Sequence, residues 1–138
     1  MSILEELIAA ERQKHRTRVR HGDEEHRIQA ACVNWFRIQY PSLRLRLFAV
    51  PNGGKRDVVT AGKLKAEGAL PGVADLILLK PNSQYGALLI EMKTEKGRQS
   101  ESQRVWETDL CRSDEYKYVV CRGMEDFIKE VTDYLRDT

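Results

Sequence analysis

Apolar residues along this chain of 138 residues recur at two spacings, and each spacing predicts a different element. Spacings of three and four residues are typical of amphipathic helices, whereas alternation or a short apolar run between turn residues is typical of strands. Helices are expected at about residues 2–13, 24–39, 58–67, 100–112 and 124–136. Strands are expected at residues 43–50, 73–79, 85–91 and 116–121. No apolar run approaches the roughly 20 residues that a membrane-spanning helix requires, so no membrane contact is expected.

Residues at the ends of the expected helices support these boundaries. Asp57 suits the N-cap of the helix at 58–67, and Gly68 suits its C-terminal end. Ser100 and Gln103 have the spacing of a capping box. The helix at 24–39 is expected to stop before Pro41, because the residue before a proline disfavours helical geometry.

The order of these elements predicts an α/β domain. The strands at 73–79 and 85–91 flank the turn-rich residues 81–84, which favours an antiparallel hairpin. The strand at 85–91, the helix at 100–112 and the strand at 116–121 form a βαβ unit, whose crossover should be right-handed and parallel. The expected result is a mixed sheet with helices on both sides, a three-layer α/β/α domain over residues 23–138.

Residues 1–22 are expected to form a separate N-terminal helix followed by a basic arm. The helix carries an apolar stripe of Ile3, Leu4, Leu7 and Ile8, which is a candidate contact in a two-fold dimer. Removing residues 1–11 is then expected to weaken dimerisation.

Asp75 and Glu91 are equally far from Ser83, at the centre of the predicted hairpin. Such a hairpin would place them opposite each other, with Cα atoms roughly 4.5–5.5 Å apart. Lys93 projects to the same side as Glu91, because alternate residues of a strand share a face. Two carboxylates and a lysine would therefore share one face at the end of a largely buried sheet.

This constellation is typical of a divalent-metal hydrolytic site. Mg²⁺ prefers oxygen ligands and a few carboxylates, so Asp75, Glu91 and the backbone carbonyl of Met92 are the predicted ligands. Lys93 would hold or deprotonate the attacking water, or neutralise a scissile phosphate. Positioning is favoured over general-base action, because a lysine beside two carboxylates stays charged. The competing interpretation is a surface Glu–Lys pair of little energetic consequence, against which the apolar run 88–90 indicates a buried strand.

Two further residues have both a chemical and a structural interpretation. Glu25 would add a carboxylate to the site, but acidic residues at a helix start also complement the helix dipole. Gln103 shares the core-facing stripe of its helix and would reach the site, but it also completes the capping box.

The distribution of charge along the chain is uneven and has two interpretations. Residues 12–65 carry thirteen Lys or Arg against four Asp or Glu, while the net charge of the whole chain is only +2. A basic segment beside an acidic site suits a protein that holds a polyanion and cuts it, but an ordinary solvated surface explains the asymmetry slightly better.

The loop Asn52-Gly53-Gly54-Lys55-Arg56 would let a DNA backbone approach its amides and its two cations, or would be a plain tight turn. It lacks the Gly-Lys-Ser/Thr ending of a P-loop, so no nucleotide cofactor is expected.

Cysteine and histidine usage excludes other classes of site. The three cysteines are dispersed and none forms a CxxC pair, so neither zinc nor a disulfide framework is expected. The three histidines lie near the N-terminus without metal-ligand spacing. The first residues also lack the layout of a signal peptide, so a cytoplasmic location is expected.

Six segments, in this order, resemble the VRR-NUC (virus-type replication-repair nuclease) domain, a branch of the PD-(D/E)xK superfamily with a restriction-endonuclease-like fold. They lie at residues 25–29, 51–56, 63–68, 71–76, 90–93 and 102–106, and they span about residues 24–120. The resemblance implies an αβββαβ core, here with an extra helix after the first strand. One departure is Ala74, where the family usually has proline before the aspartate; this loosens the backbone but removes no ligand.

The resemblance also implies an activity and its residues. The implied activity is a Mg²⁺- or Mn²⁺-dependent endonuclease, whose site comprises Glu25, Asp75, Glu91, Lys93 and Gln103. It extends the DNA contacts from the loop at 52–56 to Lys63 and Lys65. Short stand-alone members, phage-like and bacterial, act as homodimers on branched DNA such as Holliday junctions or flaps. The resemblance therefore implies a role in DNA repair, in a bacterial or phage-infected cell. The alternatives are a sequence-specific restriction-type nuclease and a non-catalytic DNA-binding module.

Overall fold

The structure is a computed structural model that describes residues 2–9, 21–51 and 58–137. A first helix covers residues 3–9. The later elements are α2 (His21–Gln39), the 3₁₀ helix η1 (Pro41–Arg46), β1 (Leu47–Ala49), α3 (Val58–Ala66), β2 (Leu76–Leu78), β3 (Leu88–Met92), α4 (Glu101–Leu110), β4 (Lys117–Cys121) and α5 (Met124–Arg136). The element order, including the helix between the first two strands, confirms the predicted fold class.

The four strands form one mixed sheet in the order β1-β2-β3-β4. The first two pairings are antiparallel and the pairing of β3 with β4 is parallel, as the βαβ unit predicts. In the hairpin, Leu76 pairs with Ile90 and Leu78 pairs with Leu88. This register is centred on Ser83, as expected, so its continuation places Asp75 opposite Glu91.

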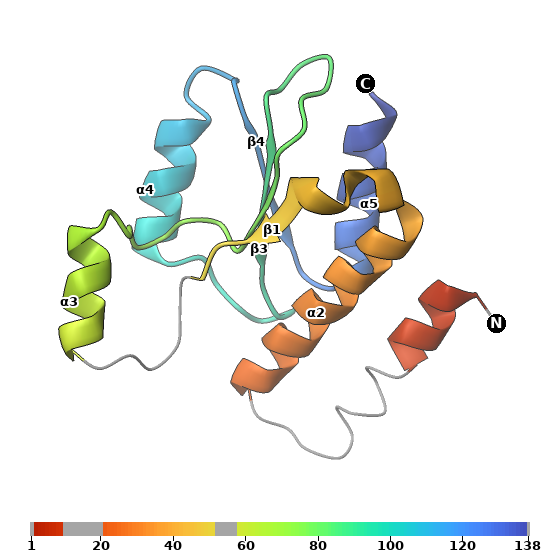
Figure 1. The fold of residues 1–138 in the computed structure, drawn as a ribbon, viewed down its shortest axis with the longest axis horizontal. Helices are drawn as coiled ribbons and strands as arrows, with labels where there is room; N and C mark the ends of the chain where they lie inside the picture. Colours follow the sequence, from red (N-terminus) through yellow and green to blue (C-terminus); the bar gives the residue numbers. More distant parts are fainter. Residues whose placement is uncertain (1, 10–20, 52–57, 138) are drawn as a thin grey trace.

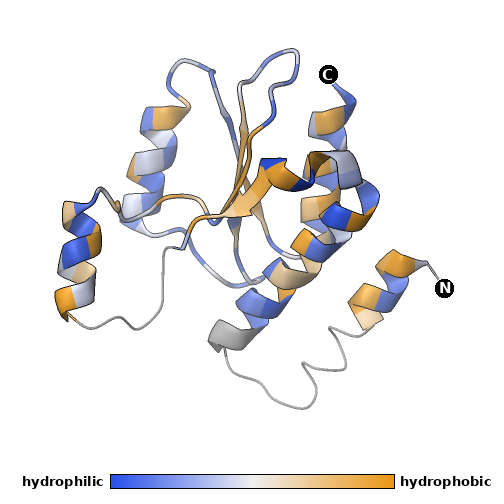
Figure 2. Ribbon diagram, in the orientation of Figure 1, coloured by the Kyte–Doolittle hydropathy of each residue, from blue (hydrophilic) through white to orange (hydrophobic). Residues whose placement is uncertain are grey.

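Helices cover both faces of the sheet, which makes three layers (Figure 1). Helices α2 and α5 pack on one face, where Phe36 and Phe127 are fully buried against Leu76 and Ile90 in one core cluster. Helix α4 covers the other face, and its Trp106 ring meets the Tyr118 ring edge-on at 6.1 Å between centroids. Apolar residues follow the strands and the helix faces turned toward them (Figure 2). None of the described helices combines the length and the apolar character that crossing a bilayer requires.

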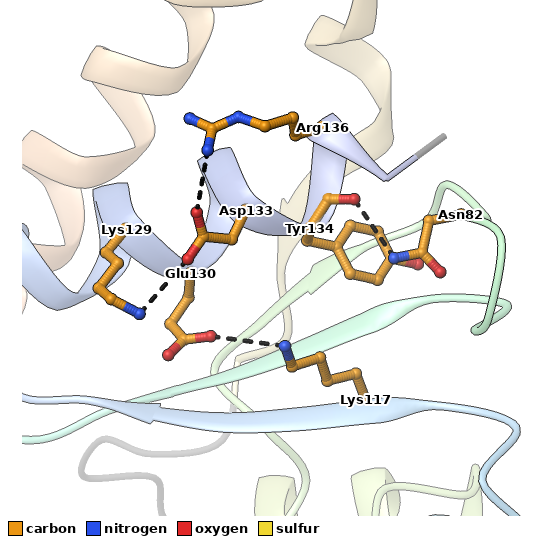
Figure 3. Close-up of polar contacts among 7 residues, drawn as sticks. All are labelled: Asn82, Lys117, Lys129, Glu130, Asp133, Tyr134 and Arg136. Atoms are coloured by element: carbon orange, nitrogen blue, oxygen red, sulfur yellow. Dashed lines mark hydrogen bonds and ion pairs between the residues drawn. The ribbon is translucent and has the colours of Figure 1, made fainter.

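The tip of the hairpin is tied to the C-terminal end of α5. Asn82 accepts hydrogen bonds from the backbone N–H groups of Gln84 and Tyr85, which closes the turn. The Asn82 amide also donates to the carbonyl of Tyr134 at 3.3 Å, as Figure 3 shows beside the ion pairs of α5. The Tyr134 hydroxyl donates to the Lys80 carbonyl at 2.6 Å. These bonds hold the register that sets Asp75 opposite Glu91 at the far end.

The segment before β1 differs from the prediction of a strand over residues 43–50. Residues Pro41–Arg46 form a 3₁₀ helix, and only Leu47–Ala49 join the sheet. Pro41 stands at the start of the helix, where its fixed φ suits helical geometry. Leu45 is 91% exposed, so the alternation of leucine and arginine does not report a buried strand face. Strands β2 and β3 are also shorter than the expected ranges 73–79 and 85–91, since β2 covers only Leu76–Leu78 and β3 begins at Leu88. Just before β3, the backbone N–H of Tyr85 donates to the Asn82 side chain instead of joining the sheet.

The apolar stripe of the first helix mostly faces this protein's own core. Leu4, Leu7 and Ile8 are partly buried and pack against the core cluster. Ile3 remains 46% exposed. A contact between protomers at this helix therefore stays a prediction, and of the four apolar residues Ile3 is the most accessible for it.

Candidate active site

Two carboxylates from neighbouring strands meet at one end of the hairpin. Asp75 directly precedes β2, and Glu91 lies within β3, fully buried at 0% exposure. The Asp75 side chain accepts a hydrogen bond from the Met92 N–H at 2.7 Å, which ties it to the neighbouring strand. The Asp75 carbonyl accepts a bond from the Val50 N–H at 2.9 Å. Both strands that flank Asp75 therefore hold it in place beside Glu91.

The two oxygens of Glu91 have different surroundings. Oε1 accepts a hydrogen bond from the Tyr118 hydroxyl at 2.9 Å. Oε2 is buried and has no hydrogen-bond partner among the described residues. A buried carboxylate oxygen without a partner is costly, because it has lost its water without gaining a donor. Oε2 is therefore the atom at this site that most needs a cation or a donor.

Burial raises the pKa of each carboxylate at this end of the sheet. For Glu91, burial is the main cause, and the Tyr118 hydrogen bond and the charge of Lys93 oppose it. For Asp75, burial again raises the pKa, while the Met92 N–H and then Lys93 lower it. Glu25, on α2, has a pKa raised by burial and then by the charge of Asp75. These three carboxylates form one electrostatic cluster in which negative charge predominates.

Lys93 supplies the positive charge that these three carboxylates share. It follows β3 directly and is half-buried, and its backbone N–H donates to the Cys121 carbonyl at 2.9 Å. Its charge lowers the pKa of Glu25, Asp75 and Glu91 alike. The structure thus brings together four of the five residues expected at the site.

The acidic residues fit a hard divalent cation that keeps part of its water shell. Within residues 2–9, 21–51 and 58–137, no three Asp, Glu, His or Cys side chains are grouped to hold a metal ion. Asp75 and Glu91 form a pair, and Mg²⁺ is commonly held by one or two carboxylates with waters and substrate oxygens completing its shell. The unpartnered Oε2 of Glu91 suits such an ion. Direct ligation by Glu25 stays a prediction.

Comparison with known proteins identifies the family. The family model described as the VRR-NUC domain matches residues 4–125. The chain belongs to the VRR-NUC family. A solved structure titled VRR_NUC domain protein shares the fold, with a TM-score of 0.70 and 23% sequence identity over 83% of this chain and 89% of that one. No curated protein matches. This is therefore a nuclease-type domain whose substrate class is DNA, and the match begins well before residue 24.

The side chain of the fifth residue, Gln103, is used for capping in this VRR-NUC domain. Its Oε1 accepts a bond from the Ser100 N–H at 2.8 Å, and its own N–H donates to Ser100 Oγ at 3.2 Å. The predicted capping box is thus confirmed. A direct role of Gln103 at the site stays a prediction.

The first turn of α4 nevertheless touches the loop that leads to Asp75. A Cβ atom on Gly72 would lie 2.5 Å from the backbone carbon and oxygen of Ser102 and 2.8 Å from the Gln103 nitrogen. Gly72 also has a φ of +86°, which side-chain-bearing residues rarely adopt. The capping box therefore shapes the VRR-NUC site by fixing the helix end against which this loop packs.

The sequence alone did not predict the polar side chains that lie near Glu91. Tyr118 bonds Glu91, and Gln99 donates to Glu107 at 2.9 Å between side chains. Burial and the bond to Glu91 raise the pKa of Tyr118, so its hydroxyl stays protonated. The parallel register pairs Tyr118 with Leu89, on the same face as Glu91. The sequence did show a tyrosine at an alternating position of the expected strand at 116–121. It could not show that this tyrosine lies beside Glu91, because the register of parallel strands cannot be derived by counting residues from a turn.

The residues predicted to contact DNA are only partly described. Lys63 and Lys65 lie in the last turn of α3 and are exposed. None of the described residues of α3 is buried, and the helix stands apart from the sheet in Figure 1. The loop residues Asn52, Gly53, Gly54, Lys55 and Arg56 lie outside the described residues.

Proposed function

We propose that this VRR-NUC domain is a Mg²⁺- or Mn²⁺-dependent endodeoxyribonuclease that hydrolyses phosphodiester bonds in branched DNA, such as four-way junctions or flaps. One observation carries the proposal. The buried carboxylate of Glu91 keeps one oxygen without a partner, opposite Asp75 and within the field of Lys93. An apolar or fully hydrogen-bonded strand end would be more stable, so the arrangement favours a function that needs a cation here.

Asp75, Glu91 and the Met92 carbonyl would hold the ion, which supplies a more acidic water and stabilises negative charge developing on a phosphate. Lys93 would orient the attacking water or neutralise the scissile phosphate, because its positive charge lies beside the carboxylates. Tyr118 keeps Glu91 oriented through Oε1, which leaves Oε2 to face the ion. Burial of Glu91 keeps competing water away from that oxygen.

The preference for branched DNA and the homodimer come from the family resemblance. A two-fold dimer presents two sites to the symmetric strands of a junction. The basic residues of α3 suit contact with the DNA backbone, which positions a substrate without reading its sequence.

Labelled linear duplex, flap and four-way DNAs, incubated with and without Mg²⁺, test the proposal. The flap and four-way DNAs are expected to be cut only when Mg²⁺ is present, at positions determined by the branch point. Glu91→Gln should abolish this cleavage, while DNA binding that weakens with salt persists. Lys129→Ala, on the exposed surface of α5, is the matched control and should cut normally. Cleavage of linear duplex at a defined sequence would instead identify a restriction-type nuclease. Binding of every DNA without cleavage in Mg²⁺ or Mn²⁺ would identify a non-catalytic module.

A further inference from the structure

Arg122 lies directly after β4 and binds the turn that follows Lys93. Its Nη1 donates to the backbone carbonyls of Thr94, at 3.0 Å, and Glu95, at 3.3 Å, and also to that of Gly97. The turn is closed by a bond from the Gly97 N–H to the Thr94 carbonyl at 3.1 Å. One cationic group therefore gathers three carbonyl oxygens of a four-residue turn.

The convergence of three carbonyls needs a positive charge. Carbonyl oxygens brought together repel one another, and neutral donors satisfy them less strongly than a charged guanidinium does. In the absence of Arg122, water would solvate these oxygens and the turn would be free to open. The side chain thus determines the conformation of residues 94–97, although it lies outside the carboxylate cluster.

The same turn supports Lys93. A Cβ atom on Gly97 would lie 3.4 Å from Lys93 Cδ and 3.1 Å from Thr94 Oγ1, so the glycine backbone packs along the lysine stem. The Lys93 N–H also donates to the carbonyl of Cys121, the residue just before Arg122. The end of β4 therefore holds Lys93 twice, through its backbone and through the turn against which its side chain lies.

We propose that Arg122 is a positioning residue for Lys93, acting through the turn Thr94–Gly97. This inference rests on the proposed nuclease function, in which Lys93 meets the attacking water or the phosphate. Because the guanidinium is bound to carbonyls of its own chain, its contribution lies in the geometry of Lys93 and not in attraction of DNA.

Kinetics of Arg122→Ala on a cleavable DNA test the proposal, with Arg112→Ala as the control at an exposed arginine in the turn after α4. Arg122→Ala should lower kcat about 10- to 100-fold, as small displacements of reacting groups do, while KM changes less than about twofold. In a Lys93→Ala background the same change should have no further effect on kcat, because the residue it positions is gone. An equal loss in both backgrounds would overturn the proposal.

Gly97→Ala tests the same link without changing any charge. The added methyl crowds Thr94 Oγ1 and Lys93 Cδ, so kcat should fall in wild type and not in Lys93→Ala. If Arg122→Ala instead raises KM and reduces the salt dependence of binding, and Gly97→Ala is silent, Arg122 contacts DNA and the positioning role is wrong.

Amide exchange of Gly97 separates this inference from the proposed function. Exchange at Gly97 should be about tenfold faster in Arg122→Ala than in wild type, because the turn opens locally. This result does not depend on cleavage. If the wild-type protein cuts no DNA, the nuclease function is refuted, but amide exchange still shows whether Arg122 holds the turn. Unchanged exchange in Arg122→Ala would overturn the role of Arg122.

Discussion

The Tyr118 hydroxyl donates to Oε1 of Glu91 at 2.9 Å and leaves Oε2 of the same carboxylate buried without a partner. The bond makes the two oxygens unequal, since Oε1 has a hydrogen-bond donor and Oε2 has none among the described residues. Partners of this kind orient the ligands of metal sites, and their loss typically costs about 10- to 100-fold in metal affinity or activity. If the site binds a metal as proposed, Tyr118 is therefore expected to affect metal binding without being a ligand.

Tyr118→Phe tests this relationship directly. The variant removes one oxygen and leaves Glu91 free to turn, so Mn²⁺ affinity and cleavage rate should each fall about 10- to 100-fold. Isothermal titration and single-turnover cleavage measure the two quantities. Tyr116→Phe, at a side chain 36% exposed, is the matched control and should leave both unchanged. Equal affinities in both variants would refute the orienting role of Tyr118.

Glu91→Gln is expected to separate stability from function. In metal-free protein the variant should have a higher free energy of unfolding, because it removes a buried charge whose second oxygen is unpaired. Added Mg²⁺ should raise the melting temperature of wild type and leave that of the variant unchanged, since ligands stabilise only the state that binds them. Thermal unfolding with EDTA or Mg²⁺ measures both effects. A variant that is less stable in EDTA would contradict this interpretation.

The raised carboxylate pKa values predict how metal-free stability depends on pH. Burial raises the pKa of Glu91 above its ordinary 4.5 and that of Asp75 above 3.8. The folded state then binds more protons than the unfolded state between the ordinary and the raised values, so stability falls as pH rises through that window. It should level off above the raised values. Urea unfolding in EDTA across this range measures the slope, and Glu91→Gln should reduce it. A slope of the opposite sign would contradict the pKa directions.

Counting residues along the chain predicted that Asp75 lies opposite Glu91, because antiparallel pairing follows a simple rule. Equal distances from Ser83 placed Asp75 opposite Glu91, and the observed register agrees. Helix α5 was equally predictable, since its apolar residues recur regularly from Met124 to Arg136. Both results depend on patterns contained within a short segment.

Residues brought together by the crossover could not be predicted in this way. The register of β4 against β3 depends on how α4 packs, so neither the Tyr118 bond nor the Arg122 contacts had a local signal. Gln103 had two roles compatible with its spacing, and the structure shows the capping role. The exposed alternation of residues 43–46 looked like a strand because apolar periodicity does not report whether a leucine is buried.

Lys63 and Lys65 give a prediction about DNA affinity. Each is exposed on α3, so each is expected to meet a phosphate. Replacing either by alanine should weaken binding to all DNA shapes similarly and reduce the slope of log affinity against log salt by about 0.9. Fluorescence anisotropy at several salt concentrations measures this slope. Lys129→Ala removes a similar exposed charge on α5 and should leave the slope unchanged, and equal losses in all three variants would deny α3 a specific role.

Gly72→Ala should destabilise the protein and disturb the site together. The new methyl would lie 2.5 Å from the backbone of Ser102, which cannot swing aside, and the φ of +86° strains any L side chain. The combined cost should be about 2–4 kcal/mol of unfolding free energy. A shift of the loop that relieved this clash would move Asp75, three residues further along the chain, so metal affinity should fall as well.

Gly62→Ala is the matched control, because its Cβ meets nothing within 4 Å and alanine favours a helix. It should be neutral or stabilising by up to about 1 kcal/mol. Urea unfolding and Mn²⁺ titration of both variants measure these effects, and a Gly72→Ala protein as stable as Gly62→Ala would mean that α4 does not press on the loop before Asp75.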